Sequence, residues 1–444
     1  MCFFGFYLVE VSSEKSYFLG LNQVVHNEQD KARIAAEKRK EQRAKVNPKG
    51  EKRAQSLYLD EYLDFKTPFC GIATQPRFNR VRYLFYCLPL CPQSTPFYFM
   101  PDIHTQAVHF GVIGYGNIGK RHARHIMAHP YARLSAICDN VAKQYSQLPT
   151  TLSFVARDTD YRQVLQIPDI EVVNVCTPNY LHADMTVAAL EAGKHVVCEK
   201  PMALSSSDCR RMIAAAAQND RKLFVVKQNR YNPPVTAVKS LLEQGILGRV
   251  YQVQVTCFWN RNDDYYLQSA WRGRKALDGG CLFTQCSHFI DILYYLIGSV
   301  QCTAGSIANF GHRQTVEFED SGAFVLRSTR DNTLVSFSFS TCAYSRNMEG
   351  AITIIAEYGV VKIGGQYLNT IEYQDIANYQ ITDLPEGNPP NDYGAYKGSM
   401  SNHDKVIDNV VETLNGRTNI ATNGYEGMHV VEIIEQMYAI ATPS

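Results

Sequence analysis

The chain has 444 residues, of which 45% are hydrophobic and 20% charged, enough apolar material for two or three domains with their own cores. A formal net charge of +1 gives no reason to expect nucleic acid or a membrane surface as a partner. No apolar run reaches the ~18 residues of a membrane span. The thirteen cysteines include no Cys-x-x-Cys pair, so we expect reduced thiols in a cytoplasmic protein and no metal site.

The first hundred residues differ from the rest of the chain. Residues 31–53 carry ten Lys and Arg against three Glu, which predicts a solvated helix or a disordered stretch. Residues 82–100 are rich in aromatic side chains but are broken by three prolines, which suits neither a strand nor a helix. No basic residue precedes the apolar stretch 2–9, so we expect no signal peptide. We expect residues 1–104 to be an extra segment, either disordered or upstream of a true start at Met100.

From residue 105 onward, strands and helices alternate. The pattern predicts a strand over 107–113, a glycine turn and a helix over 117–128, then strands near 134–139, 171–178, 195–201 and 223–226. Helices lie between the later strands, and one of them begins at the serines 205–207. Strands that are apolar throughout and alternate with helices indicate a parallel sheet covered on both faces. We therefore expect a Rossmann domain over 105–228.

Past residue 245 the pattern becomes typical of antiparallel strands. Apolar and polar residues alternate over 249–259 and 332–341, and residues 353–363 predict a hairpin that turns at Tyr358-Gly359. One helix is expected at about 282–296 and another around 406–414. These elements predict an α+β domain over 229–444 with a large, mainly antiparallel sheet.

A glycine motif stands between the first predicted strand and its helix. Gly114 would allow the tight turn, Gly116 would let the backbone approach a pyrophosphate at the helix N-terminus, and Gly119 would let helix and strand pack closely. The motif alone is weak evidence, but strand, glycines, helix, strand and acid in this order predict a dinucleotide site. The cofactor-binding residues expected at this turn are Gly114, Gly116, Asn117, Ile118 and Gly119.

Asp139 ends the next strand, twenty residues beyond Gly119. Its carboxylate is expected to accept hydrogen bonds from the adenosine ribose hydroxyls and to repel a 2′-phosphate, which favours NAD over NADP. The simpler alternative is that Asp139 only caps a loop.

Four motifs together resemble the Gfo/Idh/MocA oxidoreductases, the superfamily of glucose–fructose oxidoreductase and inositol dehydrogenase. They are GVIGYGNIGKRHA, VCTPNYLH, VVCEKP, and a Gly-Gly pair followed by SHFID. They span residues 107–291, and the strand pattern extends the likeness to about 440. Nothing before residue 101 is covered. The resemblance implies that the α+β domain over 229–444 serves substrate binding and oligomerisation.

The resemblance implies that the lysine of the EKP motif, Lys200, lies at the active site beside the nicotinamide and the substrate hydroxyl. Pro201 would fix a rigid turn, with a cis Lys200–Pro201 bond, and Glu199 would border the nicotinamide ribose. The alternative for this pair of charges is an ion pair at the end of a strand. The resemblance also places three further residues along the cofactor cleft: Thr177, Asn179 and His182, although His182 alone could be an ordinary helix-face histidine.

His288 begins a predicted helix, with Asp291 one turn further on, where its carboxylate could hold the imidazole. Oxidation of an alcohol releases a hydride from carbon and a proton from oxygen. A histidine suits the proton near neutral pH, and Lys200 would stabilise the developing alkoxide. Many relatives carry Asp four positions before this histidine, where this chain has Thr284, followed by Gln285. We therefore expect Lys200 and His288 to be the catalytic pair.

The stretch 260–291 resembles that of bacterial UDP-N-acetylglucosaminuronate 3-dehydrogenases of surface-polysaccharide pathways. Arginines can bind a diphosphate or a carboxylate through paired hydrogen bonds, and Trp and Tyr offer flat apolar faces. The alternative for each aromatic residue is a place in the core. The substrate-binding residues expected from this likeness and from the start of the second domain are Arg230, Arg261, Tyr266, Ser269, Trp271, Arg272, Thr284, Gln285 and His288.

The function expected from these observations is NAD-dependent oxidation of a ring hydroxyl of a sugar or nucleotide sugar, such as C3 of UDP-N-acetylglucosaminuronate. Three alternatives stay open: an inositol or free-sugar dehydrogenase, an NAD-dependent glycosidase that shows no net NADH, and a non-catalytic NAD-binding protein. The presence of both Lys200 and His288 argues against the last. We expect a cytoplasmic homo-oligomer with no nucleic-acid or membrane partner.

Overall fold

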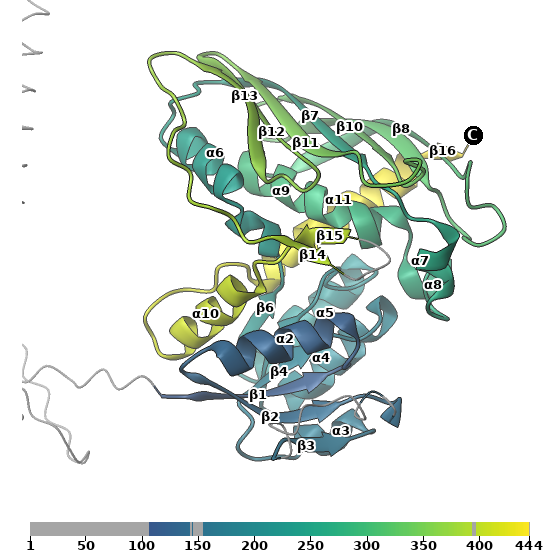
Figure 1. Cartoon of the computed structure of the whole chain (residues 1–444), viewed down its shortest axis with the longest axis vertical. Coiled ribbons are helices and arrows are strands. Elements are labelled where there is room, and N and C mark those ends of the chain that lie inside the picture. The colour runs from purple at the N-terminus through teal and green to yellow at the C-terminus, as the bar shows by residue number, and fades with distance from the viewer. Residues whose placement is uncertain (1–105, 143, 145–153, 393–396, 444) are drawn as a thin grey trace, which may run out of the picture. The chain divides into compact units, whose positions relative to one another are not determined.

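The computed structural model describes residues 106–142, 144, 154–392 and 397–443. The predictions for residues 1–104 therefore lie outside the described residues. Residues from Thr105 onward form one compact unit (Figure 1). No helix in the described part is both long and apolar enough to cross a membrane.

The first half of this unit is built on a six-stranded parallel sheet with the order β3-β2-β1-β4-β5-β6. Five of its strands are largely buried, because helices cover both faces, and this confirms the prediction from their apolar sequences; the edge strand β3 is mostly exposed and was not predicted. Ile113 pairs with Cys138 and with Val175, so the carboxyl ends of the strands meet at one edge. The strands are β1 (Val108–Ile113), β2 (Ala132–Cys138), β3 (Ala156–Asp158), β4 (Val172–Val175), β5 (His195–Cys198) and β6 (Leu223–Val225).

Helices cover the two faces of this sheet from different parts of the chain. On one face, α2 (Asn117–Ala128) packs beside α10 (His403–Leu414), whose apolar stripe is buried as the sequence predicts. On the other face lie α3 (Tyr161–Leu165), α4 (His182–Glu191) and α5 (Ser206–Gln218). The side chain of Ser205 accepts a hydrogen bond from the amide of Asp208 and so caps α5.

The second half is built on an eight-stranded sheet with the order β13-β12-β11-β7-β10-β9-β8-β16. It is mainly antiparallel, but β7 pairs with β10, and β8 with β16, in parallel, because long connections separate these strands in the chain. Ala356 pairs with Gly359, which confirms the predicted hairpin, although its turn lies at Glu357-Tyr358, one residue earlier than expected. The strands are β7 (Val250–Phe258), β8 (Val300–Ala308), β9 (Ser321–Ser328), β10 (Leu334–Ser340), β11 (Glu349–Ala356), β12 (Gly359–Gly364), β13 (Thr370–Ile376) and β16 (Thr442–Pro443), with a separate pair β14 (Pro390–Asp392) and β15 (Lys397–Met400).

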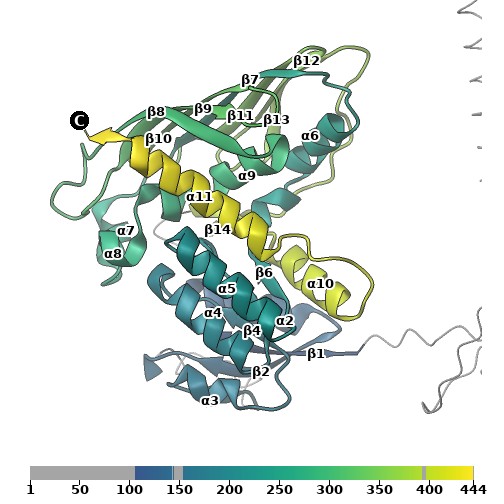
Figure 2. The ribbon, with the colours of Figure 1, turned by 180° about the vertical axis from the view of Figure 1, so that it is seen from behind.

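One face of this second sheet is covered by α6 (Pro233–Glu243), α9 (Ser287–Ile297) and α11 (Gly424–Ile440) (Figures 1 and 2). The helix expected at 282–296 is in fact a π-helical turn over Leu282–Cys286 that leads into α9. This part of the chain also contains the short helices η4 (Gln228–Tyr231), α7 (Asp263–Leu267) and α8 (Lys275–Asp278).

A single apolar core joins the two halves. It contains Val173 and Val196 of the first sheet, Met212 of α5, Ile434 of α11 and Val253 of the second sheet. Helix α11 lies against both α5 and β8, so it is apolar on more than one side. The nine cysteines in the described part are free, and Cys342 alone among them is exposed. The domain boundary at 228/229 remains a prediction.

Candidate active site

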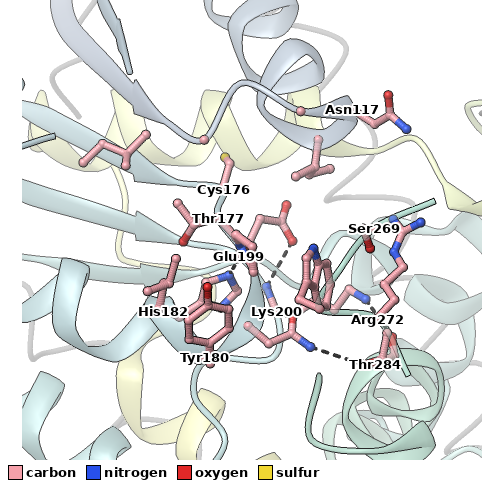
Figure 3. A pocket seen from close by; sticks show the side chains of 18 of the residues that line it. Asn117, Cys176, Thr177, Tyr180, His182, Glu199, Lys200, Ser269, Arg272 and Thr284 are labelled. Atoms are coloured by element: carbon pink, nitrogen blue, oxygen red, sulfur yellow. Dashed lines mark hydrogen bonds between the residues drawn. The ribbon is translucent and has the colours of Figure 1, made fainter. Parts of the chain in front are cut away.

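A cavity of about 690 Å³ lies at the edge where the carboxyl ends of β1, β2, β4 and β5 meet. Its other walls come from residues 259–272 and 284–288, and from Asn391, Gly398, Ser399 and His403. In an α/β protein this edge is where ligands bind. Figure 3 shows side chains from both sets of segments around one space.

The glycine turn leaves room for a ligand at one end of this cavity. Gly114 has φ +88°, and a Cβ there would lie 2.6 Å from the carbonyl oxygen of Cys176. A Cβ on Gly119 would lie 1.8 Å from the carbonyl oxygen of Gly114, whereas one on Gly116 would meet nothing within 4 Å. No side chain caps the N-terminus of α2, and its first turn holds no acid. This turn therefore fits an anionic diphosphate such as that of NAD.

Most of the expected cofactor residues line the cavity, as the sequence predicts, but Gly119 does not. Gly119 instead provides the close contact between α2 and the turn. Asp139 lines the cavity and also accepts hydrogen bonds from the amides of Tyr115 (2.7 Å) and Val141 (2.9 Å). Asp139 therefore caps a loop and also lines the cavity, and its contact with the ribose stays a prediction.

The loop after β4 forms the next wall of the cavity. The hydroxyl of Thr177 is buried and has no hydrogen-bond partner among the described residues, so a ligand could supply one. His182 places Nδ1 2.7 Å from the carbonyl of Pro201 and Nε2 2.9 Å from that of Thr177. Burial lowers the pKa of His182, and its ring joins two loops, so neither nitrogen is directed at a ligand.

Lys200 is directed into the cavity at the end of β5. The Lys200–Pro201 bond is cis, which confirms the expectation. The Lys200 ammonium donates a hydrogen bond to the carbonyl of Thr284 at 3.0 Å, in the π-helical turn. Burial lowers the pKa of Lys200 to about 8, although the Glu199 carboxylate opposes this shift. These residues are therefore not an ordinary ion pair on the surface.

His288 is buried and lines the cavity near Lys200. Burial, then the positive charges of Lys200 and Lys227, hold the pKa of His288 well below its usual value. The imidazole is therefore neutral at physiological pH and can accept a proton.

Asp291 does not hold His288, contrary to expectation. Its carboxylate accepts two hydrogen bonds from Arg230, at 2.7 and 3.0 Å, and lies 3.6 Å from the Lys227 ammonium. Arg230 also pairs with Glu426 at 2.6 Å and does not line the cavity, so the structure does not place it with the other expected substrate residues. The pattern of the sequence does not reveal this pairing, because the partners are far apart in the chain.

The substrate half of the cavity contains two arginines. Arg261 is buried, donates to Gln285 at 2.9 Å and to Asn347 at 3.1 Å, and stacks over the Trp259 ring. Arg272 lies over the Tyr265 ring, with the guanidinium carbon Cζ 4.5 Å from the ring centroid. The expected residues that line this half are Arg261, Ser269, Trp271, Arg272, Thr284, Gln285 and His288.

Tyr266 is the other expected substrate residue that does not line the cavity. Its ring packs on the ring of His312, with 5.3 Å between the centroids, and on Phe318. Tyr266 therefore lies in the core, which is the alternative stated for each aromatic residue. The neighbouring Tyr265 lines the cavity instead, because successive residues of a helix point about 100° apart.

Several residues at the site were not predicted from the sequence. Asp278 is fully buried. Its carboxylate accepts hydrogen bonds from the backbone amide of Gly273 at 2.9 Å, from the hydroxyl of Thr284 and from the side-chain amide of Asn179. Burial raises its pKa. The carboxyl group of Asp278 thus contacts Thr284, although Thr284 itself carries no charge. Further lining residues that lack a motif are Gln228, Trp259, Tyr265, Asn391, Gly398, Ser399 and His403.

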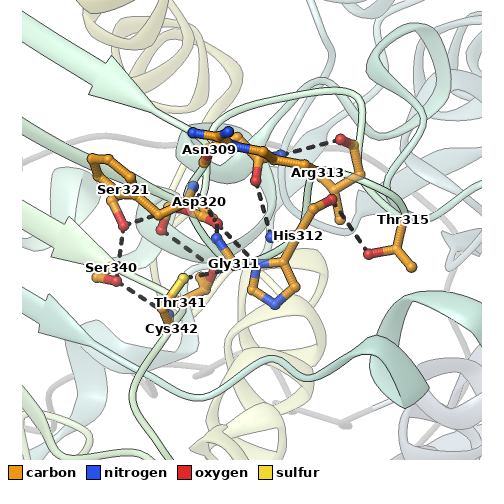
Figure 4. Close-up of polar contacts among 12 residues, drawn as sticks. Asn309, Gly311, His312, Arg313, Thr315, Asp320, Ser321, Ser340, Thr341 and Cys342 are labelled. Carbon is orange, nitrogen blue, oxygen red and sulfur yellow. Dashed lines mark hydrogen bonds and ion pairs between the residues drawn. The ribbon is translucent and has the colours of Figure 1, made fainter. Parts of the chain in front are cut away.

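The loop that carries Arg261 is supported by a second loop, over residues 309–320 (Figure 4). His312 lies 3.1 Å from the Asp320 carboxylate and 3.8 Å from the Cys342 sulfur, and Thr315 donates to Asp263 at 2.7 Å. His, Asp and Cys can bind a metal, but the Asp320 oxygens already accept backbone amides of Phe310 and Gly311. That the chain holds no metal stays a prediction.

Two family models match the chain. Residues 108–227 match the Gfo/Idh/MocA oxidoreductase family with its NAD-binding Rossmann fold, and residues 235–362 match the Gfo/Idh/MocA C-terminal domain.

Solved and curated relatives are similar as well. The WlbA dehydrogenase of Bordetella pertussis, solved with NADH and UDP-GlcNAcA, is 32% identical, with a TM-score of 0.67 over 75% of this chain and 96% of that one. Levoglucosan dehydrogenase of Pseudarthrobacter phenanthrenivorans is 32% identical over 44% of this chain and 52% of its own length. Inositol 2-dehydrogenase of Salmonella typhimurium is 26% identical over 55% of this chain and 70% of its own. The match thus spans only about half the length of the levoglucosan enzyme.

Proposed function

We infer that this chain, which belongs to the Gfo/Idh/MocA family of NAD-binding oxidoreductases, is a dehydrogenase that oxidises a ring hydroxyl of a sugar or nucleotide sugar. One observation carries the proposal. The Lys200 ammonium and the neutral His288 imidazole share a cavity with an uncapped helix N-terminus and a glycine turn that leaves space for a diphosphate.

The residues of the cavity divide the chemistry between them. Bound at the glycine turn, NAD would supply an acceptor for the hydride that leaves the substrate carbon. Lys200 stabilises negative charge on the substrate oxygen in a site partly shielded from water. His288 is the group that accepts the hydroxyl proton, since it lines the same cavity and its ring is neutral because burial lowers its pKa. The Thr284 carbonyl keeps the Lys200 ammonium in place at 3.0 Å.

We propose a nucleotide sugar rather than a free sugar as substrate, with UDP-N-acetylglucosaminuronate as the first candidate. Two arginines, Arg261 and Arg272, line the substrate half, and guanidinium groups suit carboxylates and diphosphates. The WlbA relative was solved with UDP-GlcNAcA. Buried polar atoms without hydrogen-bond partners also line the cavity and could contact a polar ligand: Thr177 Oγ1, Gln228 Oε1, Ser269 Oγ and Asn391 Oδ1.

The function is tested by offering the purified protein NAD with UDP-sugars, free sugars, levoglucosan and inositol while NADH absorbance is followed. We expect NADH to form fastest with UDP-N-acetylglucosaminuronate. NADH from inositol or levoglucosan alone would support the free-sugar alternative. Hydrolysis of a glycoside without net NADH would support the glycosidase, and binding of NAD with no reaction would contradict enzymatic function.

Asp139→Ala should lower the preference for NAD over NADP. The ribose hydroxyls would lose an acceptor, and a 2′-phosphate would lose a repulsive neighbour. The measurement is the ratio of kcat/KM for the two cofactors. Asp139→Asn is the matched control, because an amide oxygen can still cap the loop without the charge. A ratio unchanged in both variants would mean that Asp139 does not contact the ribose.

Arg272→Ala should reduce kcat/KM for a UDP-sugar far more than for a small sugar. A charge-assisted hydrogen bond to a phosphate or carboxylate is worth about 1.5–3 kcal/mol, or roughly ten- to a hundredfold. Equal losses on the two substrates would show that Arg272 supports the wall of the cavity through its stacking on Tyr265.

A further inference from the structure

Three buried side chains from three separate elements meet beside Lys200. Glu199 follows β5, His122 lies in α2 and His403 is the first residue of α10. The Oε1 atom of Glu199 lies 2.9 Å from Nε2 of His122 and 3.4 Å from Nε2 of His403. The exposed fractions of these residues are 5%, 0% and 1%. Elements distant in the sequence thus converge on one carboxylate oxygen.

The direction of the hydrogen bonds around His122 is set by Asn174. The Asn174 amide donates to Nδ1 of His122 at 2.7 Å, so the proton of a neutral His122 ring stands on Nε2 and is donated to Glu199. The other carboxylate oxygen, Oε2, accepts the backbone amide of Lys200 at 3.0 Å. Both oxygens of Glu199 therefore have donors, and the ionised form is the one that these donors stabilise.

The Glu199 side chain is ionised although it is buried. Burial opposes ionisation, but the hydrogen bond from His122, together with the His403 ring 3.4 Å away, outweighs it and holds the pKa of Glu199 well below its usual value. Burial lowers the pKa of His403 to about 4, although Glu199 opposes this, so that ring stays neutral. A carboxylate without these donors would be costly to keep charged in such a site.

The ammonium of Lys200 needs such an anion. Burial and the nearby cations Lys227 and Arg261 all favour the neutral amine, and Glu199 and Asp278 alone favour the charged form among the groups that act most strongly on it. Asp278 is itself a carboxyl whose pKa burial raises. Glu199 is thus the neighbour whose negative charge is secured by hydrogen-bond donors.

We propose that His122 and His403 clamp Glu199 as a fixed, ionised carboxylate beside the cavity, and that this anion keeps the Lys200 ammonium charged for the reaction. The inference rests on the proposed function. It makes His122 and His403 positioning residues, which act on Lys200 through Glu199 and not on the substrate.

The test compares the pH dependence of kcat/KM in His122→Ala, His403→Ala and the wild type. Without its donors Glu199 binds a proton more readily, the pKa of Lys200 falls, and the alkaline limb of the profile should move to lower pH by about one unit. His403→Gln, which keeps an N–H donor, should restore part of the shift. His129→Ala is the matched control, because His129 follows α2 and pairs with the exposed Asp408 at 3.4 Å. Its profile should match the wild type.

A second measurement needs no turnover. Competitive labelling with acetic anhydride, followed by mass spectrometry, gives the protonation midpoint of Lys200, with the exposed Lys222 as internal reference. The midpoint should fall in both alanine variants and in Glu199→Gln, which decides the question if the histidine variants fail to fold. An unchanged midpoint in folded variants would overturn the clamp. A wild type that shows the expected midpoints but oxidises no sugar would overturn the proposed function alone.

Discussion

Lys200→Met should lower kcat by roughly 10²-fold or more, about 2.7 kcal/mol on the barrier. Methionine keeps most of the length and the apolar stem of lysine but removes the charge that stabilises the substrate oxygen. It also removes the hydrogen bond to the Thr284 carbonyl. NAD affinity should change little, because the glycine turn and Asp139 line a different end of the cavity. Single-turnover NADH formation and calorimetric titration with NAD measure the two quantities.

His288→Ala is the companion variant. It should also lower kcat strongly, and the double variant should lose less than the sum of the two single losses, because both groups handle one proton. Full additivity would assign the two residues to separate steps. A Lys200→Met protein that turns over near the wild-type rate would leave Lys200 as a structural cation bound to Thr284.

Asp291→Ala should lower the free energy of unfolding by about 3–5 kcal/mol, because it leaves the buried charges of Arg230 and Lys227 without their shared carboxylate. Burial disfavours the charged guanidinium, but Asp291 and Glu426 outweigh it and hold the pKa of Arg230 above its usual value. The ion pair between Arg230 and Asp291 joins η4 to α9, and both elements lie beside the cavity. Urea unfolding followed by circular dichroism gives the change.

Glu426→Gln provides the control for this ion pair. Glu426 contacts the same guanidinium but is partly exposed, so its loss should cost only about 1 kcal/mol. If Asp291→Ala cost no more than Glu426→Gln, the ion pair would not be a main source of stability.

The sequence predicts those parts of the fold that local patterns determine. Five strands of the first sheet follow from their apolar sequences, and the glycine turn follows from its spacing, but the short edge strand β3 has no apolar pattern and was not predicted. Helix α11 is less visible, because it packs against two layers and lacks a clean apolar stripe. The parallel pairing of β7 with β10 depends on connections that period-two alternation does not reveal.

The site shows the same limit at the level of single residues. Motifs predicted the positions of Lys200 and His288, but a motif cannot show which of Tyr265 and Tyr266 faces the cavity, since that depends on the rotation of a five-residue helix. Charged partners far apart in the chain are invisible to spacing rules. Asp291 therefore looked like a partner of His288, when its carboxylate is in fact taken by Arg230.

The continuous apolar core has a consequence for modularity. Nucleotide-binding and substrate-binding halves are often regarded as exchangeable units, but here α11, at the end of the chain, packs against α5 of the first half as closely as against β8 of the second. Helix α10 likewise returns to complete a face of the first sheet. A chimera that joined this first half to the second half of a relative would have to carry over both terminal helices with their matching surfaces. The unit that can be inherited or recombined is therefore the whole of the described fold.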